Sequence, residues 1–289
     1  MSIPGCTIAA IRSGNRYLLA SNSDNPWGTR TKLQIKQGKD LKFIGTELVC
    51  PDDSLPWSNM ITRGINDKGI AFTFSYVDCN PDLYQGGPGF KDFGYHILGS
   101  FQSLKEIEHY LRHEPLQVHG NFLFADDLGN LLVCEIHPEE RFFEWNPESS
   151  FIRTNHFLNL PFTNDREIQE TCSILRYQSG IYALGQQRAT NVPPLEFLTA
   201  LLRNHHLKEK QSDWGASTCN HGRIAGTVSS EILDPLTKKI FYCFGPPCGE
   251  GKEMNGWGKY VPFQLSDKEE EELTTIDGEI LGRGPNHSE

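Results

Sequence analysis

Short apolar stretches alternate with polar turn sequences along most of the chain. Five pairs of such stretches are each separated by residues rich in Gly, Asn, Asp or Pro, a pattern typical of β-hairpins. The paired stretches are residues 6–11 with 17–22, 60–65 with 70–76, 120–125 with 131–136, 142–145 with 151–155, and 226–233 with 239–244. The pattern predicts a protein rich in antiparallel sheet.

Helical periodicity is confined to the middle of the chain. Ser103 and Glu106 have the spacing of a capping box, and apolar residues line one face of residues 104–111. Residues 164–182 also show helical spacing, and Pro194 is expected to open a helix that continues through Leu202. Because helices cluster between hairpins and do not alternate with single strands, the pattern favours an α+β fold with antiparallel sheets. The Pro- and Gly-rich residues 81–89 are interpreted as a long loop that covers a site.

Length and charge narrow the class of protein. The length of 289 residues suits one large domain or two small ones. We find no clear linker and expect a single domain over residues 6–265, followed by an acidic and mobile tail over residues 266–289. The formal net charge of -10 disfavours a nucleic-acid partner, which would require a basic face. We find no apolar run of 18 residues and no basic segment followed by an apolar one near the start. We therefore expect a cytoplasmic protein without a membrane partner.

The eight Cys residues are too sparse to form a disulfide scaffold in a chain of this length. The sequence has no Cys-x-x-Cys pair, and Cys219-Asn220-His221 has an unusual spacing for metal ligands. The expectation is that most Cys are reduced core residues and that the protein has no metal or other cofactor.

Cys6 is the candidate nucleophile. It lies in Gly5-Cys6-Thr7 at the head of an apolar strand. Cleavage of the Gly5–Cys6 bond would place a thiol and a free α-amine on one residue, and the amine would accept the thiol proton near neutral pH. The alternative is an ordinary small residue at the start of a strand.

Five local patterns occur in an order that supports the nucleophile. They are Gly5-Cys6-Thr7, residues 20–25 (ASNSDN), residues 64–71 (GINDKGIA), residues 153–157 (RTNHF), and the set CNH, GTVSS and GPPCGE within residues 219–250. Together they resemble the N-terminal-nucleophile (Ntn) hydrolases that act on linear amides. The chain looks most similar to the acyl-coenzyme A:6-aminopenicillanic acid acyltransferase family, and the choloylglycine hydrolases look like more distant relatives.

The resemblance implies a four-layer αββα sandwich in which two stacked antiparallel sheets lie between helix layers. It also implies that the chain cleaves itself before Cys6 and releases a leader of residues 1–5. Asp24 matches the Asp that orients the nucleophile and its amine, and Asn155 matches the Asn that donates to the oxyanion. Arg223 matches a late Arg near the nucleophile, across a gap in the local alignment.

His156 and His221 lie in matching motifs, and each is interpreted as a hydrogen-bonded structural residue. Two positions depart from the choloylglycine hydrolases. Those enzymes have Arg where this chain has Ser21, and Asn where it has Ser75 or Tyr76. The departures favour the acyltransferase-like branch over an enzyme of bile salts.

The resulting hypothesis is an amidohydrolase or acyltransferase that works through a Cys6 thioester on a small-molecule amide or acyl substrate. Two alternatives remain at this stage, a non-catalytic relative that binds a small acyl metabolite and a general peptidase. The sequence leaves the oligomeric state open, a homo-oligomer included.

Overall fold

The computed structural model describes residues 5–52, 57–80, 83, 87–147, 150–162, 167–187, 192–205, 216–251, 254–265 and 270–281. The loop expected over residues 81–89 lies mostly outside these ranges. The strands are β1 (Gly5–Ser13), β2 (Arg16–Pro26), β3 (Arg30–Gln37), β4 (Lys42–Val49), β5 (Met60–Asn66), β6 (Ala71–Tyr76), β7 (Gly120–Ala125), β8 (Leu131–Ile136), β9 (Arg141–Trp145), β10 (Ser150–Arg153), β11 (Ala225–Asp234), β12 (Lys239–Phe244), β13 (Val261–Gln264) and β14 (Glu271–Glu272). The helices are α1 (Phe90–Ser100), α2 (Leu104–His113), α3 (Glu167–Gln187) and α4 (Pro194–Leu202).

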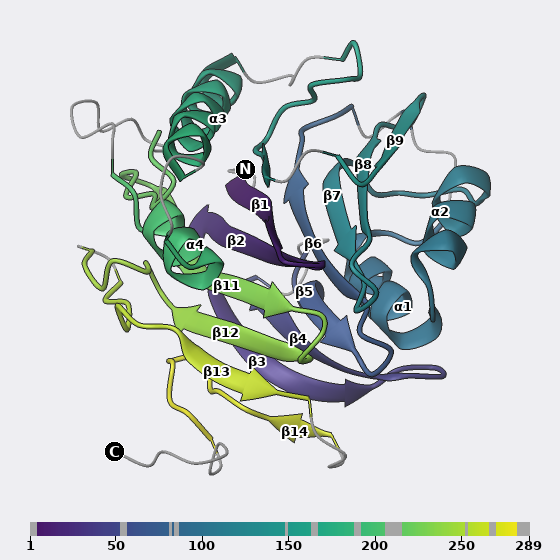
Figure 1. Cartoon of the computed structure of the whole chain (residues 1–289). Coiled ribbons are helices and arrows are strands. Elements are labelled where there is room, and N and C mark those ends of the chain that lie inside the picture. The colour runs from purple at the N-terminus through teal and green to yellow at the C-terminus, as the bar shows by residue number, and fades with distance from the viewer. Residues whose placement is uncertain are drawn as a thin grey trace.

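The strands form two antiparallel sheets that face each other. One has six strands in the order β10-β1-β2-β11-β12-β13, and the other has eight in the order β14-β3-β4-β5-β6-β7-β8-β9. Helices α3 and α4 cover the outer face of the six-stranded sheet, and α1 and α2 cover that of the eight-stranded sheet (Figure 1). The predicted four-layer αββα architecture is confirmed.

Alternation along β1 shows how the layers are built. Ile8 and Ala10 belong to the core between the two sheets, and Ala9 and Ile11 pack in the cluster under α3 and α4. Because successive side chains of a strand point to opposite faces, Cys6 lies on the face that looks toward the other sheet. Both faces of β1 are therefore buried, which explains why its sequence is apolar at nearly every position.

Four of the five predicted hairpins are confirmed as β1–β2, β5–β6, β7–β8 and β11–β12. The pair predicted over residues 142–145 and 151–155 is wrong in its partner. Strand β9 pairs with β8 in one sheet, and β10 pairs with β1 in the other. The chain therefore passes from the eight-stranded sheet to the six-stranded sheet between β9 and β10.

Helices α2, α3 and α4 agree with the predicted periodic segments, although residues 164–166 lie outside the described ranges. The side chain of Ser103 accepts from the backbone N–H of Glu106 at 3.3 Å, so the expected cap of α2 is present. Helix α1 and strands β3, β4, β13 and β14 were not predicted.

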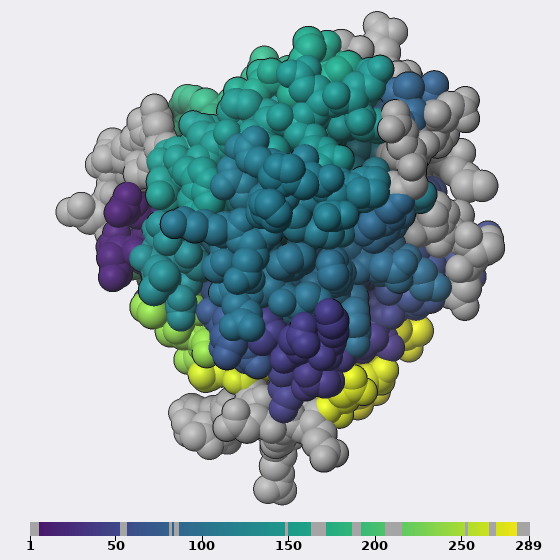
Figure 2. Space-filling model, turned by 90° about the vertical axis from the view of Figure 1, so that its right-hand side faces the viewer, coloured from purple at the N-terminus to yellow at the C-terminus, as the bar shows by residue number. Residues whose placement is uncertain are grey.

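Part of the expected mobile tail belongs to the sandwich. Glu271 and Glu272 pair with Ile35 and Gln34 of β3, and Leu273 is buried in the core between the sheets. Figures 1 and 2 show this C-terminal segment in yellow beside the purple-blue part of the chain. The described part of the tail therefore closes one edge of the eight-stranded sheet.

Among the described residues, none of the helices combines the length and the apolar character that a membrane span requires.

Candidate active site

Cys6 lies near the start of β1, at one end of the sandwich, where β2 and β6 also end and β5 begins. Its side chain is 5% exposed. Burial raises the pKa of the thiol, and the Arg63 guanidinium opposes that rise. A buried thiol is therefore placed beside a positive charge that favours its ionised form.

Arg63 reaches Cys6 from the opposite sheet. It lies on β5, and its Nη2 donates to Cys6 Sγ at 3.4 Å. The guanidinium also forms a salt bridge of 3.1 Å with Glu231 on β11, and both side chains are almost fully buried. Its Nε donates to the hydroxyl of Ser21. Ser21 lies on β2, so this hydrogen bond also joins the two sheets.

Asp24 lies on β2 directly opposite Gly5, in a pair adjacent to that of Cys6 with Ser23. Its Oδ1 accepts from the hydroxyl of Thr227 at 2.7 Å. Its Oδ2 is buried and has no hydrogen-bond partner within the described part of the chain. Burial raises the pKa of this carboxyl to about 6, against the opposing effect of Arg176. Hydrogen bonds from Thr227 and Asn220 oppose that rise, and the carboxyl lies in the strand pair next to the Gly5–Cys6 bond.

Asn155 lies just beyond β10, and its side-chain amide contacts the backbone of Cys6. Oδ1 accepts from the Cys6 N–H at 3.0 Å and from the guanidinium of Arg176, while Nδ2 donates to the carbonyl of Tyr76 at 2.6 Å. These contacts fix the orientation of the amide. In a flipped amide, Nδ2 would face the two N–H donors and Oδ1 would face the Tyr76 carbonyl oxygen. The carbonyl oxygen of the amide therefore points at the nitrogen that would become the α-amine.

Helix α3 holds Asn155 in place through two residues one turn apart. The hydroxyl of Ser173 accepts from the Asn155 backbone N–H at 2.6 Å, and Arg176 reaches the side chain. His156 Nδ1 contacts the same Ser173 hydroxyl at 2.7 Å. Burial lowers the pKa of His156 to about 4, so the ring is neutral at pH 7. The geometry agrees with the expected structural role of His156.

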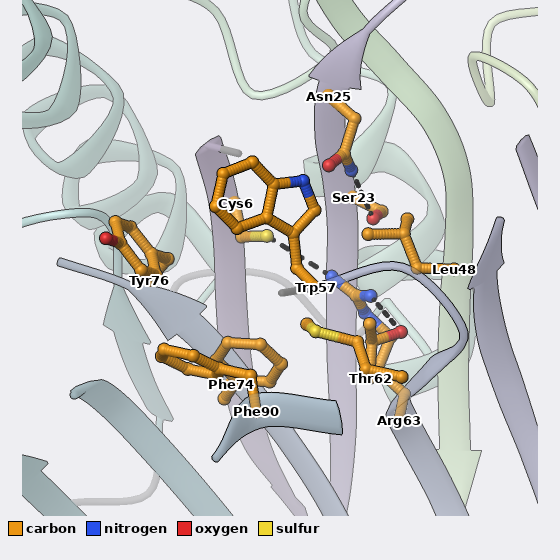
Figure 3. Close-up of a pocket in the computed structure, with 11 residues that line it drawn as sticks. Cys6, Ser23, Asn25, Leu48, Trp57, Thr62, Arg63, Phe74, Tyr76 and Phe90 are labelled. Carbon is orange, nitrogen blue, oxygen red and sulfur yellow. Dashed lines mark hydrogen bonds between the residues drawn. The ribbon is translucent and has the colours of Figure 1, made fainter. Parts of the chain in front are cut away.

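A narrow pocket opens at Cys6, with a free cavity volume of about 20 Å³. Figure 3 shows the indole of Trp57 and the rings of Phe74, Tyr76 and Phe90 around the thiol. Leu48 and Met60 complete the apolar wall, and the polar wall comes from Ser23, Asn25, Thr62 and Arg63. A mostly apolar pocket with a few polar groups at one end is typical of a small-molecule site.

The structure brings three of the four predicted residues together. Cys6, Asp24 and Asn155 are within one network, whereas Arg223 is exposed in the segment before β11 and does not line the pocket. The role of Arg223 stays a prediction. The cations that reach the network are Arg63 and Arg176.

Sequence reasoning missed Arg63, Arg176 and Glu231. A signal existed for Arg63 and Glu231, because each is a charged residue inside an otherwise apolar or small-residue strand, and such residues are seldom fully buried unless paired.

The sequence matches one known protein family over most of its length. The chain matches the profile of the acyl-coenzyme A:6-aminopenicillanic acid acyl-transferase family over residues 13–247. The chain belongs to this family. The match begins after Cys6 and includes Asp24, Arg63, Asn155 and Arg176. A search of curated proteins gives no match.

Solved structures agree with this member of the acyl-transferase family in fold. A mutant of conjugated bile acid hydrolase from Clostridium perfringens is 12% identical, with a TM-score of 0.56 over 96% of this chain and 99% of that one. A second variant of the same hydrolase is 12% identical, with a TM-score of 0.54 over 98% and 100%. Penicillin V acylase from Agrobacterium tumefaciens is 14% identical over 82% of each chain, with a TM-score of 0.48. The two bile acid hydrolase structures show that the acyl-transferase-family chain has the Ntn-hydrolase fold.

Proposed function

We propose that this protein is a self-processing amidohydrolase or acyltransferase whose nucleophile is the N-terminal Cys6 released by cleavage of the Gly5–Cys6 bond. The observation that supports it most is the contact between Asn155 Oδ1 and the Cys6 nitrogen at 3.0 Å, beside a thiol that also contacts Arg63. If cleavage turns the Cys6 nitrogen into an α-amine, Asn155 Oδ1 can accept a hydrogen bond from that amine and hold it next to the thiol.

Self-cleavage begins when Cys6 Sγ attacks the carbonyl carbon of Gly5. The S–C bond forms, the tetrahedral species collapses, and the C–N bond to Cys6 breaks as its nitrogen takes up a proton. The product is a thioester between Gly5 and the Cys6 sulfur. Water then hydrolyses the thioester, which releases the leader with a carboxylate on Gly5 and leaves a free thiol and α-amine on Cys6. Gly5 has no side chain to obstruct the attack.

The same atoms then perform turnover. The α-amine is held by Asn155 Oδ1 and accepts the thiol proton, while Asp24, which pairs with Gly5 across the strands, supplies a nearby negative charge. The thiolate attacks the carbonyl carbon of the substrate amide, and the leaving amine takes the proton from the α-ammonium. Water or a second amine resolves the acyl thioester, so hydrolysis and transfer differ only in the final acceptor.

Asn155 is also assigned to the oxyanion. Its amide has two N–H groups, one of which donates to the Tyr76 carbonyl. The other is assigned to the negative oxygen of the tetrahedral species. Loss of one such donor typically lowers the rate about 10²–10³-fold.

The pocket favours an apolar or aromatic acyl group. Trp57, Phe74 and Phe90 line the space next to Cys6, and the charged Arg63 lies behind the sulfur. A charged acyl chain would lose its hydration there, and the one charged side chain of the lining, Arg63, is already paired with Glu231. Amides and coenzyme A thioesters of aryl and aliphatic acids are therefore the substrates to test.

Intact-mass spectrometry of the purified protein tests the proposal. The wild type should lose residues 1–5, and Cys6→Ala should retain them. Cys6→Ser, which keeps a weaker nucleophile of similar shape, should be processed more slowly than the wild type. A wild type that keeps its leader and hydrolyses amides would contradict the N-terminal-amine mechanism. A wild type that keeps its leader, binds acyl compounds and turns none over would identify a non-catalytic binding protein.

A further inference from the structure

Four side chains of the types that bind metals converge outside the candidate active site. They are His205, Cys219, His221 and Cys248, and one donor atom from each lies within 4.8 Å of all the others. Cys219 is buried and the other three are half-buried. Two imidazoles and two thiols form a donor set that is typical of structural zinc sites.

The distances fit a tetrahedral ion. His221 Nε2 lies 3.4 Å from Cys219 Sγ and 3.2 Å from Cys248 Sγ. Ordinary zinc bonds of about 2.3 Å to sulfur and about 2.0 Å to nitrogen, at the tetrahedral angle, would separate a nitrogen and a sulfur ligand by about 3.5 Å. The cluster therefore needs small displacements to surround an ion.

His205 provides a second and independent observation. Its Nε2 is buried and has no hydrogen-bond partner within the described part of the chain. Buried polar nitrogens are nearly always paired, so an orphan beside three other donors points to a missing partner. The His205 ring lies 5.0 Å from that of His221 at an angle of 70°, so the two rings are not stacked and the nitrogens can approach one ion from different directions.

The backbone around the cluster resembles the support of a bound thiolate. The N–H of Glu250 donates to Cys248 Sγ at 3.4 Å, a hydrogen bond that stabilises negative charge on sulfur. The N–H of Cys219 donates to the carbonyl of Asn204 at 3.0 Å, which fixes the residue before His205 against the segment that carries Cys219 and His221. Backbone hydrogen bonds therefore hold the segments that carry the four donors close together.

We propose that His205, Cys219, His221 and Cys248 bind one zinc ion. Both thiols lose their protons to solvent on binding, and both imidazoles bind as neutral rings. Four protein ligands leave no open coordination position, so the ion is structural. The sequence-based expectation was that no metal is bound, because the chain has no Cys-x-x-Cys pair and Cys219-Asn220-His221 has an unusual spacing for metal ligands. The other two donors lie far from this pair in the sequence: His205 follows α4, and Cys248 lies in the loop after β12.

A chain of hydrogen bonds links the proposed zinc site to the candidate active site. Asn220 lies between two of the ligands, and its backbone N–H donates to the Thr227 hydroxyl at 2.9 Å. Thr227 in turn donates to Asp24 Oδ1 at 2.7 Å. Zinc would therefore hold the segment that positions a hydrogen-bond partner of Asp24, although it touches neither Cys6 nor the pocket.

The experiment uses the full-length chain without a polyhistidine tag. Elemental analysis of protein purified with added zinc should give about one zinc per chain. Cys248→Ser and His205→Ala should each lose most of it, and Cys243→Ala, a buried Cys in the neighbouring strand β12, should retain it. A wild type with no stoichiometric zinc after reconstitution would overturn the proposal.

A second measurement avoids variants that fail to fold. The wild-type protein is freed of metal by a chelator and titrated with Co²⁺. We expect a thiolate-to-cobalt charge-transfer band and the intense visible bands of a tetrahedral ion, both lost on addition of excess zinc. Zinc should also protect Cys219 and Cys248 from alkylation. Peptide mapping that finds a Cys219–Cys248 disulfide, or thiols that react equally with and without zinc, would show that the cluster is not a metal site.

Discussion

Arg63 and Cys6 contact each other across the interface between the two sheets, with Nη2 3.4 Å from the sulfur. The cation comes from β5 of the eight-stranded sheet and the thiol from β1 of the six-stranded sheet. The charge that favours the thiolate is therefore supplied by packing of the two sheets, and not by a neighbour in sequence.

The double variant Arg63→Gln/Glu231→Gln tests this contact without leaving one buried charge unpaired. Loss of the cation should raise the pKa of Cys6, because burial is then unopposed by Arg63. Alkylation of Cys6 near pH 8 should slow about tenfold for each unit by which the pKa rises. Quantitative peptide mapping after brief iodoacetamide treatment measures the rate.

The matched control for that rate is Lys32→Gln/Glu272→Gln, which removes an ion pair at the edge of the eight-stranded sheet, with Glu272 55% exposed. It should leave alkylation of Cys6 unchanged. Equal rates in the wild type and in the Arg63/Glu231 variant would show that the guanidinium does not activate the thiol.

Asn155→Asp separates the two tasks assigned to Asn155. The carboxylate keeps an acceptor for the Cys6 nitrogen and for Arg176, but it cannot donate to an oxyanion. The processed variant should lose two to three orders of magnitude in kcat with little change in KM. Steady-state kinetics on an amide substrate measures both constants.

Asn155→Ala also removes the acceptor, so self-cleavage should slow as well. Because Asn155 is fully buried and makes hydrogen bonds to three partners, this variant should also lose about 1–3 kcal/mol of stability through unpaired buried groups. A folded Asn155→Ala protein that matures and turns over at the wild-type rate would remove Asn155 from the site.

Asp24 should make the precursor less stable as the pH rises from about 4 to about 6. Burial raises the pKa of its carboxyl to about 6 in the folded state, and the unfolded value is near the ordinary one of 3.8. The folded chain thus binds more protons in this window, and the free energy of unfolding falls with increasing pH by up to about 3 kcal/mol. Denaturant unfolding of Cys6→Ala, which keeps the precursor intact, measures the curve.

The contribution of Asp24 is isolated by adding Asp24→Asn to the Cys6→Ala chain. Other buried groups titrate in the same range, among them His156, so only the difference between the two curves is assigned to Asp24. That difference should change between pH 4 and 6 and be flat above pH 7. A constant difference over the whole range would mean that the carboxyl is not perturbed.

Leu273→Ala tests whether the C-terminal segment is part of the core. Leu273 is 9% exposed and packs between the sheets, so its truncation should lower the free energy of unfolding by about 2 kcal/mol. Ile276→Ala, three residues later and 40% exposed, is the control and should cost less than about 0.5 kcal/mol. Denaturant unfolding compares them, and equal losses would place Leu273 outside the core.

The sequence predicted those parts of the fold that local chemistry determines. Hairpins with short polar turns and the capped helix α2 were found because turn residues and caps act over a few positions. Strands β3 and β4 were missed because charged residues such as Lys32, Lys36 and Glu47 interrupt their apolar pattern. The structure pairs both Lys side chains with Glu47, a relation between two strands that neither segment reveals alone.

In the candidate site too, residues in local motifs were predicted and residues from distant segments were not. Cys6 was predicted from its place at the head of a strand, and Asp24 and Asn155 were predicted because they match positions in an ordered set of family motifs. Arg63 and Arg176 were not, since they enter the site from β5 and α3 and their nearest functional partners are 57 and 21 positions away. The partner of β10 was misjudged for a related reason, because register between distant strands is set by packing and not by the intervening turn.

The pair of Arg63 and Glu231, buried between β5 and β11, makes readiness of the nucleophile a property of the finished sandwich. A nascent chain that has formed β1 and β2 but has not docked β5 carries a thiol with no cation beside it. Under the proposed mechanism, the thiol of such a chain would react slowly and the leader peptide would stay attached. Only chains in which both sheets have assembled would then lose the leader. The mass lost on processing would therefore report how many chains have completed folding.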